Sequence, residues 1–524
     1  MKFFTTEGPV NCLKHYCLPP LERFDLDEIL QLIAKEKYFL LHAPRQTGKT
    51  TSLLALTAYL NQEGAYRALY ANIEGAQAAR ENIEMGMAEV VQSIAFSARD
   101  SLGDDNAPVL AGDVLGRVSA TSVLKEFLNR WCHMASNPTV LILDEVDALV
   151  GDTLISLLRQ LRAGYPNRPK LFPQTVILCG VRDIQDYRIH SDKEKAVITG
   201  GSAFNIKSES LRMGDFTEKE VKTLLNAHTV ETGQAFEPEA ADLVWKLTCG
   251  QPWLVNALAY ETCFKMKEGR NRLLPITADM ILNAKEHLIL NRVTHLDQLA
   301  DKLMEPRVRR IIEPMLAGQM IGEGVSDDDR QYVIDLGLVR RDSGGLTISN
   351  PIYREVIPRT LAGAPQDTLP RISPTWLKPD GSLDTDRLLE SFLVFWRQHG
   401  EPMLRSTAYH EIAPHLVLMA FMHRVVNGGG VIDREYAIGS GRMDLCIRYG
   451  GVKLAIELKV WRDRKPDPLS EGLKQIEGYL QGLSLDSGWL VIFDRRSGQP
   501  DIEERTYTES AKTKAGLAVT VIRA

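Results

Sequence analysis

The sequence predicts an α/β protein of several domains, and three observations carry this prediction. Short apolar runs alternate with longer amphipathic stretches up to about residue 205, as parallel strands covered by helices do. From about residue 206 to 290 the strand signal disappears and helical periodicity dominates. A proline-rich segment, 361–380, then precedes a second series of strand-like runs. We therefore expect two α/β domains joined by largely helical segments.

The domain boundaries should follow these changes of pattern. A chain of 524 residues should hold about three or four domains, at roughly 150 residues each. Between 291 and 360, helices precede Ser343-Gly344-Gly345, which could turn a small hairpin, and this order suits a winged-helix module. We expect an N-terminal leader, a parallel-sheet core, a helical lid, a winged-helix module, a linker and a second α/β domain at residues 1–20, 21–205, 206–290, 291–360, 361–380 and 381–524.

Composition and charge exclude several classes of protein. The apolar fraction of 44% and the charged fraction of 25% are those of a globular chain, and a net charge of -6 excludes a generally basic surface, although not a local basic groove. No run approaches the roughly 18 apolar residues of a membrane span, and the N-terminus lacks the pattern of an export signal. The seven cysteines are scattered, without zinc-site spacing. We expect a cytoplasmic protein with reduced thiols and no membrane partner.

The stretch "EKYFLLHAPRQTGKTTSLLALTAYL" reads as a buried strand, a loop and an amphipathic helix. In a P-loop, backbone N–H groups of such a turn wrap phosphates, a lysine reaches the terminal phosphates, and a Ser or Thr hydroxyl holds Mg²⁺. Lys49 and Thr50 fit the last two roles, while Ala43 replaces the usual first glycine. The predicted nucleotide-binding residues of this loop are Ala43, Pro44, Arg45, Gln46, Thr47, Gly48, Lys49, Thr50 and Thr51.

A second apolar run, "TVLILDEVDAL", ends in two acids and supports the same interpretation. Asp144 at the end of that strand would bind Mg²⁺ together with Thr50, and Glu145 would orient a water for attack on the γ-phosphate as the catalytic base. The structural alternative is a helix start with a solvated lysine and an ordinary strand end. Because two motifs occur in the right order, we predict a nucleotide site.

These residues resemble the AAA-like branch of P-loop ATPases, in particular the archaeal-type and signal-transducing ATPases, in which "PRxTGKT" and "LILDE" recur. The resemblance implies ATP as the nucleotide. It also implies nucleotide contacts from Arg182 in "CGVRD" and from Pro252 in Gly250-Gln251-Pro252 of the lid, and adenine contacts from "HYCLPPLERF". An arginine finger acting in trans would require a homo-oligomer, and Arg159, Arg162 and Arg292 are weaker candidates for it than Arg182.

A different set of acids lies near the other end of the chain. "GRMDLCIRYGGVKLAIELKVWR" reads as two strands joined at Gly450-Gly451, with Asp444 at the head of the first and Glu457 and Lys459 at the tail of the second. Carboxylates on adjacent strands can hold Mg²⁺, and the bound ion can activate a water molecule that attacks a phosphodiester. Lys459 shares a strand face with Glu457 and would stabilise the developing charge.

The surrounding segments resemble the PD-(D/E)XK nuclease superfamily, whose fold is that of restriction endonucleases, from about Leu388 to Arg496. The resemblance implies that Glu411, on the helix before the strands, adds a metal ligand, and that Gln475, on the helix after "ELK", belongs to the catalytic set. Met443 stands where the superfamily's proline usually lies. Two alternatives without nuclease activity stay open. One is an ordinary α/β domain with a surface ion pair between Glu457 and a lysine, and the other is a nuclease fold that has lost its activity.

Basic residues could add nucleic-acid contacts. Arg462, Arg464 and Lys465 follow the second strand, but Asp463 and Asp467 dilute their charge, which favours a solvated loop. In the winged-helix region Arg307, Arg309 and Arg310 could meet DNA or could lie on a packing module.

We therefore expect an ATP-binding and ATP-hydrolysing switch that controls a Mg²⁺-dependent nuclease, with DNA favoured over RNA as the partner. Such fusions suggest genome defence or mobile-element biology. Two alternatives stay open: a nucleotide-switched DNA-binding or signalling ATPase with an inactive nuclease fold, and an ATPase whose C-terminal domain binds protein.

Overall fold

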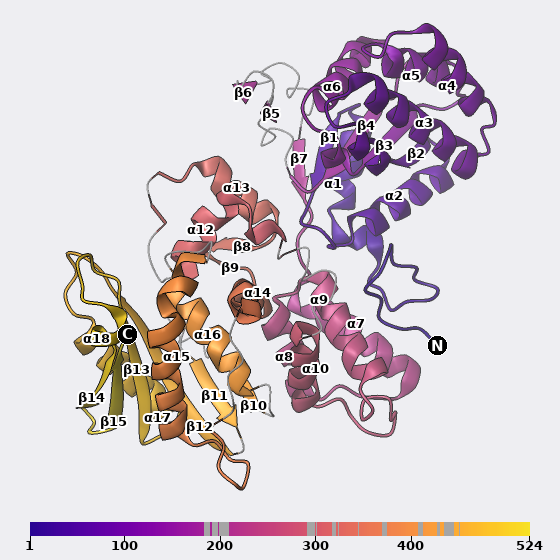
Figure 1. The fold of residues 1–524 in the computed structure, drawn as a ribbon. Coiled ribbons are helices and arrows are strands. Elements are labelled where there is room, and N and C mark those ends of the chain that lie inside the picture. Colours follow the sequence, from indigo (N-terminus) through magenta and orange to yellow (C-terminus); the bar gives the residue numbers. More distant parts are fainter. Residues whose placement is uncertain are drawn as a thin grey trace. The chain divides into compact units, whose positions relative to one another are not determined.

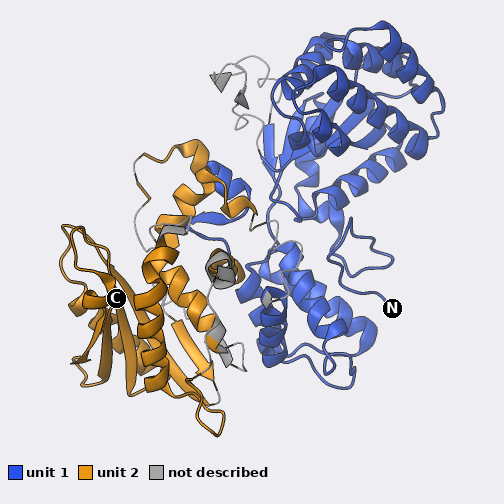
Figure 2. Cartoon of the chain, in the orientation of Figure 1, with its two compact units in different colours: residues 1–291, 331–351 blue, residues 292–330, 352–524 orange. Residues whose placement is uncertain are grey.

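The computed structural model describes residues 1–182, 189–190, 197–198, 209–290, 299, 301–316, 321–322, 324–343, 345–368, 375–406, 412–426, 430–433, 445–449 and 451–524. The chain forms two compact units (Figure 2). One contains Met1–Asn291 and Gln331–Pro351, and the other contains Arg292–Arg330 and Ile352–Ala524. Residues 331–351, expected within a separate winged-helix module, thus belong to the N-terminal unit.

The N-terminal unit is built on a five-stranded sheet with the order β2-β3-β4-β1-β7 (Figure 1). Neighbouring strands are parallel, which confirms the predicted parallel α/β core. Strand β4 lies between β1 and β3, so the loops after all three open at one edge of the sheet. The strands are β1 (Phe39–His42), β2 (Arg67–Asn72), β3 (Thr139–Asp144), β4 (Thr175–Gly180) and β7 (Glu209–Arg212), with a separate ribbon of β5 (Ile189–His190) and β6 (Val197–Ile198).

Helices cover both faces of this sheet, because alternate strand residues point to opposite sides. Leu141 and Leu143 face a core built with α3–α6, whereas Val140 and Ile142 face α1 and α2. The helices are α1 (Leu26–Ala34), α2 (Lys49–Glu63), α3 (Ile83–Leu102), α4 (Asn106–Arg117), α5 (Val123–His133) and α6 (Asp152–Gly164), with short turns η1 (Pro20–Arg23), η2 (Glu74–Ala79), η3 (Val146–Ala148) and η4 (Tyr165–Asn167).

A helical segment follows β7, and we name it the lid after the role predicted for residues 206–290. Its first helix begins at the predicted capping box: the Thr217 hydroxyl accepts from Glu220 N at 3.2 Å, and the Glu220 carboxylate accepts from Thr217 N at 2.7 Å. The lid helices are α7 (Glu218–Thr232), α8 (Pro238–Thr248), α9 (Pro252–Tyr260), the π-helical turn η7 (Glu261–Lys265) and α10 (Ala278–Leu290).

The segment after the lid contains helices and a hairpin in the expected order. It comprises α12 (Pro306–Leu316), α13 (Asp327–Asp335), the antiparallel strands β8 (Val339–Asp342) and β9 (Gly345–Ile348), and α14 (Pro351–Thr368). Helix α14 continues eight residues into the predicted linker, 361–380. Local sequence does not show this, because Pro358 and Pro365 break the helical pattern without ending the helix.

The C-terminal unit contains a mixed six-stranded sheet with the order β10-β11-β12-β13-β15-β14. The predicted hairpin is present: β11 and β12 are antiparallel and Gly451 has a φ of +83°. The strands are β10 (Gly430–Asp433), β11 (Leu445–Tyr449), β12 (Val452–Trp461), β13 (Ser487–Asp494), β14 (Tyr507–Lys512) and β15 (Ala518–Arg523). The last two strands, β14 and β15, were not predicted from the sequence.

Besides α12 and nearly all of α14, this unit contains the helices α15 (Thr385–Ser406), α16 (Ala413–Val426), α17 (Leu469–Leu483) and α18 (Ile502–Arg505). Ile476 and Leu480 of α17 share a core cluster with Ala455 of β12 and Leu490 of β13. On the opposite face, Phe493 packs against side chains of α15 and α16. The sheet is therefore covered on both faces by helices.

One expectation about the cysteines was wrong. Cys12 and Cys17 are joined by a disulfide near the N-terminus, whereas Cys132, Cys179, Cys249, Cys263 and Cys446 are free. Within the described ranges, every helix is too short or too polar to cross a bilayer.

The turn before α9 depends on a glycine. Gly250 has a φ of +81°, and a Cβ there would lie 1.8 Å from the carbonyl oxygen of Phe216. We predict that Gly250→Ala lowers the free energy of unfolding by roughly 1–2 kcal/mol for the left-handed backbone and by roughly 1–3 kcal/mol more for the forced movement of Phe216. Gly233 is the matched control, since it has a φ of +76° and no atom within 4 Å of an added Cβ. Urea unfolding of both variants measures the difference, and equal losses would contradict the steric argument.

Candidate functional sites

The P-loop connects β1 to α2 as predicted. Gly48, at the N-terminus of α2, has a φ of +94°, a conformation that glycine adopts without strain. The Lys49 side chain is buried, and its Nζ donates to the carbonyl oxygens of Ala43 and Pro44, at 2.9 Å each. The carbonyl oxygens of the loop thus fix the position of the lysine ammonium group. This group lies at the N-terminus of α2, where free backbone N–H groups favour anions.

Helix α2 and strand β3 bring an alcohol and a carboxylate together. Thr50 Oγ1 donates to Asp144 Oδ2 at 2.8 Å, and Asp144 is completely buried. Tyr70 on β2 also donates to Asp144 Oδ2, at 2.9 Å. Hard oxygen ligands of this kind suit Mg²⁺, so Thr50 and Asp144 fit the predicted cation. Tyr70 was not predicted from the sequence, because its hydroxyl reaches the site only through the pairing of β2 with β3.

Glu145 follows Asp144 in a left-handed conformation with a φ of 59°. Its backbone N–H donates to Asp144 Oδ1 at 2.9 Å. Burial, with the nearby charges of Asp147 and Asp144, raises the pKa of the Glu145 carboxyl, and Lys49 and Arg45 partly oppose this shift. Asp147 in turn accepts from Val181 N at 3.0 Å and joins the ends of β3 and β4.

A pocket of about 150 Å³ lies beside the P-loop. The N-terminal segment, the P-loop, α2 and the lid all contribute to its wall, and the predicted residue Pro252 is among them. The lining residues are Thr5, Thr6, Glu7, Gly8, Val10, Tyr16, Cys17, Leu18, Pro20, Arg23, Gln46, Thr47, Gly48, Thr51, Ser52, Phe216, Leu224, Pro252, Trp253 and Asn256. Five of them come from "HYCLPPLERF", the segment expected to contact adenine.

Hydrogen bonds fix the N-terminal segment across this pocket. Val10 N donates to Thr51 Oγ1 at 2.9 Å, and Trp253 Nε1 donates to Thr6 O at 3.0 Å. The leader therefore contacts both α2 and lid helix α9, and is an integral part of the pocket.

Arg182 contacts two residues of helix α13. Its Nε lies 3.7 Å from Asp335 Oδ2, and its guanidinium lies 4.8 Å from the ring centre of Tyr332. Both partners belong to segment 331–351, and Gly337 of that segment lies against Pro44 of the P-loop. The assignment of Arg182 to the nucleotide stays a prediction.

The second candidate site is on β12. Glu457 and Lys459 are both buried, and Lys459 Nζ donates to Glu457 Oε1 at 2.6 Å. Glu457 Oε2 is also buried, and it has no hydrogen-bond partner within the described part of the chain. A carboxylate oxygen in this state is unusual, because burial without a partner is costly. It is suited to a metal ion or another ligand that would provide this missing partner.

Gln475 lies on the helix that covers this face of the sheet. Ala455 shares the face of β12 that carries Glu457 and Lys459, and it packs against Ile476 of α17. Gln475 Nε2 donates to Glu471 at 3.1 Å, while its buried Oε1 has no hydrogen-bond partner among residues that the structure describes.

Two predicted metal ligands, Asp444 and Glu411, lie outside the described residues. Leu445, which follows Asp444 in sequence, pairs with Ile456, which precedes Glu457. His415 on α16 is buried, and burial together with the charge of Lys459 lowers its pKa to about 4, so its imidazole is neutral at pH 7.

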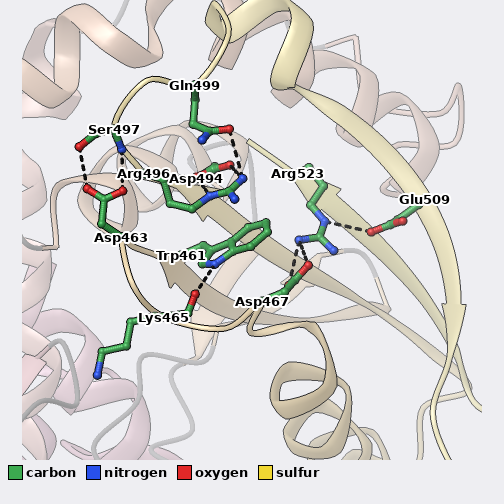
Figure 3. A network of polar contacts seen from close by, with 10 residues as sticks. All are labelled: Trp461, Asp463, Lys465, Asp467, Asp494, Arg496, Ser497, Gln499, Glu509 and Arg523. Carbon is green, nitrogen blue, oxygen red and sulfur yellow. Dashed lines mark hydrogen bonds and ion pairs between the residues drawn. The ribbon is translucent and has the colours of Figure 1, made fainter.

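The loop after β12 is held by its acids (Figure 3). Asp463 accepts from the backbone and hydroxyl of Ser497, at 2.9 and 2.6 Å, and Asp467 pairs with Arg523 at 2.9 Å. Trp461, on the strand face of Lys459, lies 3.4 Å beneath the guanidinium of Arg496. The acids that dilute the basic run in sequence therefore fix the loop to neighbouring elements.

The basic face of α12 is partly neutralised. Arg307 pairs with Asp328 and Asp329 at 2.7 and 3.1 Å, and Arg310 lies 3.8 Å from Asp329. These ion pairs favour the packing role over DNA contact for Arg307.

The comparisons with known proteins address the first site. Residues 33–187 match the family model described as an AAA domain. No curated protein matches the chain.

Several solved structures align with the chain at low similarity. A Walker-type ATPase of Pyrococcus abyssi is 14% identical, with 68% of this chain and 99% of its own covered and a TM-score of 0.47. The Orc1 protein of Aeropyrum pernix, solved in complex with DNA, is 15% identical over 67% and 94%, with a TM-score of 0.35. The RuvB Holliday junction branch migration motor of Thermotoga maritima is 14% identical over 64% and 96%, with a TM-score of 0.35.

These alignments say nothing about substrate or partner at such similarity. The family match covers the P-loop, strand β2 with Tyr70, and strand β3 with Asp144. Residues 33–187 are accordingly a P-loop ATPase domain of the AAA type.

Proposed function

We propose that this protein is an ATP-binding and ATP-hydrolysing switch that controls a Mg²⁺-dependent nuclease in its C-terminal unit. The observation that carries the nuclease half is Glu457: it is buried, bonded through one oxygen to Lys459, and without a hydrogen-bond partner on the other oxygen within the described part of the chain. A carboxylate and a lysine on one strand face supply a metal ligand and a stabiliser of phosphorane charge.

ATP would bind with its phosphates at the N-terminus of α2. Lys49 would exchange the carbonyl oxygens of Ala43 and Pro44 for phosphate oxygens, which gives its charge an anionic partner. Thr50 and Asp144 would hold Mg²⁺, which neutralises phosphate charge when bound. Glu145 would accept a proton from the water that attacks the γ-phosphorus, as the bond to the ADP oxygen breaks. The base of the nucleotide would occupy the pocket beside Gly48.

In the nuclease site Glu457, with the predicted ligands Asp444 and Glu411, would hold Mg²⁺, which polarises the phosphodiester and activates water. Lys459 would remain on the Glu457 face and stabilise negative charge on the scissile phosphate, and Gln475 would help to position it. We propose DNA rather than RNA as the substrate, and genome defence or mobile-element biology as the setting.

Contacts of the ATPase site could couple nucleotide binding to the C-terminal unit. Segment 331–351 lies against Pro44 and holds Arg182 through Asp335. The same segment is continuous at both ends with residues of the C-terminal unit, through α13 and α14. A nucleotide that moves the P-loop or Arg182 would therefore act on the two chain segments that enter the second unit.

The proposed nuclease site can be tested with variants of residues on strand β12. Supercoiled plasmid, single-stranded DNA and RNA are incubated with Mg²⁺, with and without ATP. We expect Glu457→Gln and Lys459→Met to lower the rate of cleavage by about 100-fold or more, because each removes a group that acts on the transition state. Lys453→Met is the matched control, since Lys453 is an exposed lysine on β12.

Full cleavage by Glu457→Gln would contradict the proposed site. Nucleic-acid binding without cleavage by the wild type would instead favour the inactive nuclease fold, and absence of both would favour a protein-binding C-terminal domain.

The ATPase prediction separates binding from hydrolysis. Lys49→Ala should abolish ATP binding, because the terminal phosphates lose their cationic partner. Glu145→Gln should bind ATP with near wild-type affinity but hydrolyse it about 100-fold more slowly, since a general base contributes roughly that factor or more. Binding is measured by calorimetry and hydrolysis by phosphate release. Rapid hydrolysis by Glu145→Gln would rule out its role as base.

The raised pKa of Glu145 predicts a pH dependence of stability. The folded state keeps the Glu145 proton to a higher pH than the unfolded chain, so this contribution to stability is complete below the ordinary value of 4.5 and is lost as the pH rises through the folded pKa. Glu145→Gln should therefore gain stability relative to the wild type as the pH rises from 4 to 8, measured by urea unfolding. Glu63→Gln, at the exposed end of α2, should show no such trend.

A further inference from the structure

Asn256 carries a hydrogen-bond acceptor that the fold leaves unused. The residue lies on lid helix α9 and is only 8% exposed. Its Nδ2 donates to the carbonyl oxygen of Pro252 at 2.9 Å, and a carbonyl can only accept, so the amide orientation is fixed. Its Oδ1 is buried, with no hydrogen-bond partner among the described residues. Buried polar atoms of side chains nearly always have a partner, so this oxygen indicates an absent donor.

The position of Asn256 connects that donor with the nucleotide pocket. Asn256 belongs to the pocket wall together with Gly48 of the P-loop. The polar ends of two aromatic residues in the wall are already engaged: Tyr16 Oη lies 3.2 Å from His228 Nδ1, and Trp253 Nε1 donates to Thr6 O at 3.0 Å. These side chains therefore offer mainly apolar surface to a ring system, whereas Asn256 contributes to the wall a residue whose acceptor has no partner among the described residues.

We infer that Asn256 determines the choice of base, by accepting a hydrogen bond from the 6-amino group of adenine. The inference rests on the proposed binding of ATP at this site. Adenine presents an amino donor at position 6, where guanine and hypoxanthine present a carbonyl acceptor. An acceptor opposite Asn256 Oδ1 would leave two oxygens facing each other, so the same residue favours adenine and disfavours 6-oxopurines.

The test compares base analogues on the full chain. The dissociation constants of ATP, purine riboside triphosphate, which carries hydrogen at position 6, and inosine triphosphate are measured by calorimetry with Mg²⁺. We expect the wild type to bind ATP about tenfold more tightly than purine riboside triphosphate, and inosine triphosphate more weakly still. In Asn256→Leu the ratio of ATP to purine riboside triphosphate should fall to about one, with the affinity for the latter unchanged.

Two further variants isolate the acceptor. Asn256→Asp keeps an oxygen at this position and should retain a preference for ATP over purine riboside triphosphate. Asn283→Leu changes an exposed asparagine on lid helix α10 and should keep the wild-type ratio.

Any of the following results would overturn the inference. An unchanged ratio in Asn256→Leu, with the individual affinities also unchanged, would show that Asn256 does not contact the base. An equal loss for all three nucleotides would assign it a structural role only. Binding of no nucleotide by the wild type would refute the proposed ATP site itself, whereas binding that depends on Lys49 but not on Asn256 would refute only the base assignment.

Discussion

The N-terminal site depends on one buried carboxylate. Asp144 has no exposed surface, and the hydroxyl groups of Thr50 and Tyr70 and the backbone of Glu145 donate to it. A buried carboxylate is tolerated only with such donors. The three donors come from α2, β2 and the turn after β3, so Asp144 fixes the distance between the N-terminus of α2 and the end of β3. The alcohol and the acid that would share a cation are in contact before one binds.

The two candidate sites hold their lysines in a similar way. Lys49 donates to two carbonyl oxygens of its own loop, and Lys459 donates to Glu457 on the same strand. In both cases a buried ammonium is satisfied by oxygen atoms. For Lys49, whose partners are neutral carbonyl oxygens, phosphate oxygens would be stronger partners because they are charged, whereas Lys459 already has an anionic partner in Glu457. The difference is in the acids. Asp144 has donors on both oxygens, whereas Glu457 Oε2 has none within the described residues, which makes Glu457 the less complete site.

Sequence periodicity and local motifs predicted the elements that depend on neighbouring residues. The parallel strands, the P-loop turn at Gly48, the capping box at Thr217 and the hairpin at Gly451 all follow from short-range patterns, and the structure contains each of them. What could not be predicted depends on contacts across the fold. Tyr70 joins the site through strand order, Asn256 through the packing of the lid, and Asp335 through the position of segment 331–351. The extension of α14 past Pro358 likewise depends on tertiary packing, which overrides a helix breaker.

The buried ion pair between Arg182 and Asp335 could link nucleotide binding to the position of segment 331–351. Asp335 is buried, and the Gln331 side chain donates to the other carboxylate oxygen at 2.8 Å. If Arg182 turned to a nucleotide while Asp335 stayed in place, the buried ion pair between the two residues would be broken, and breaking a buried ion pair costs about 3–5 kcal/mol. Arg182 can therefore contact phosphate without this free-energy cost only if segment 331–351 moves as well. Since α13 and α14 continue from that segment into the C-terminal unit, the same ion pair that restrains the arginine would tie nucleotide contact to a change in the chain segments leading to Glu457 and Lys459.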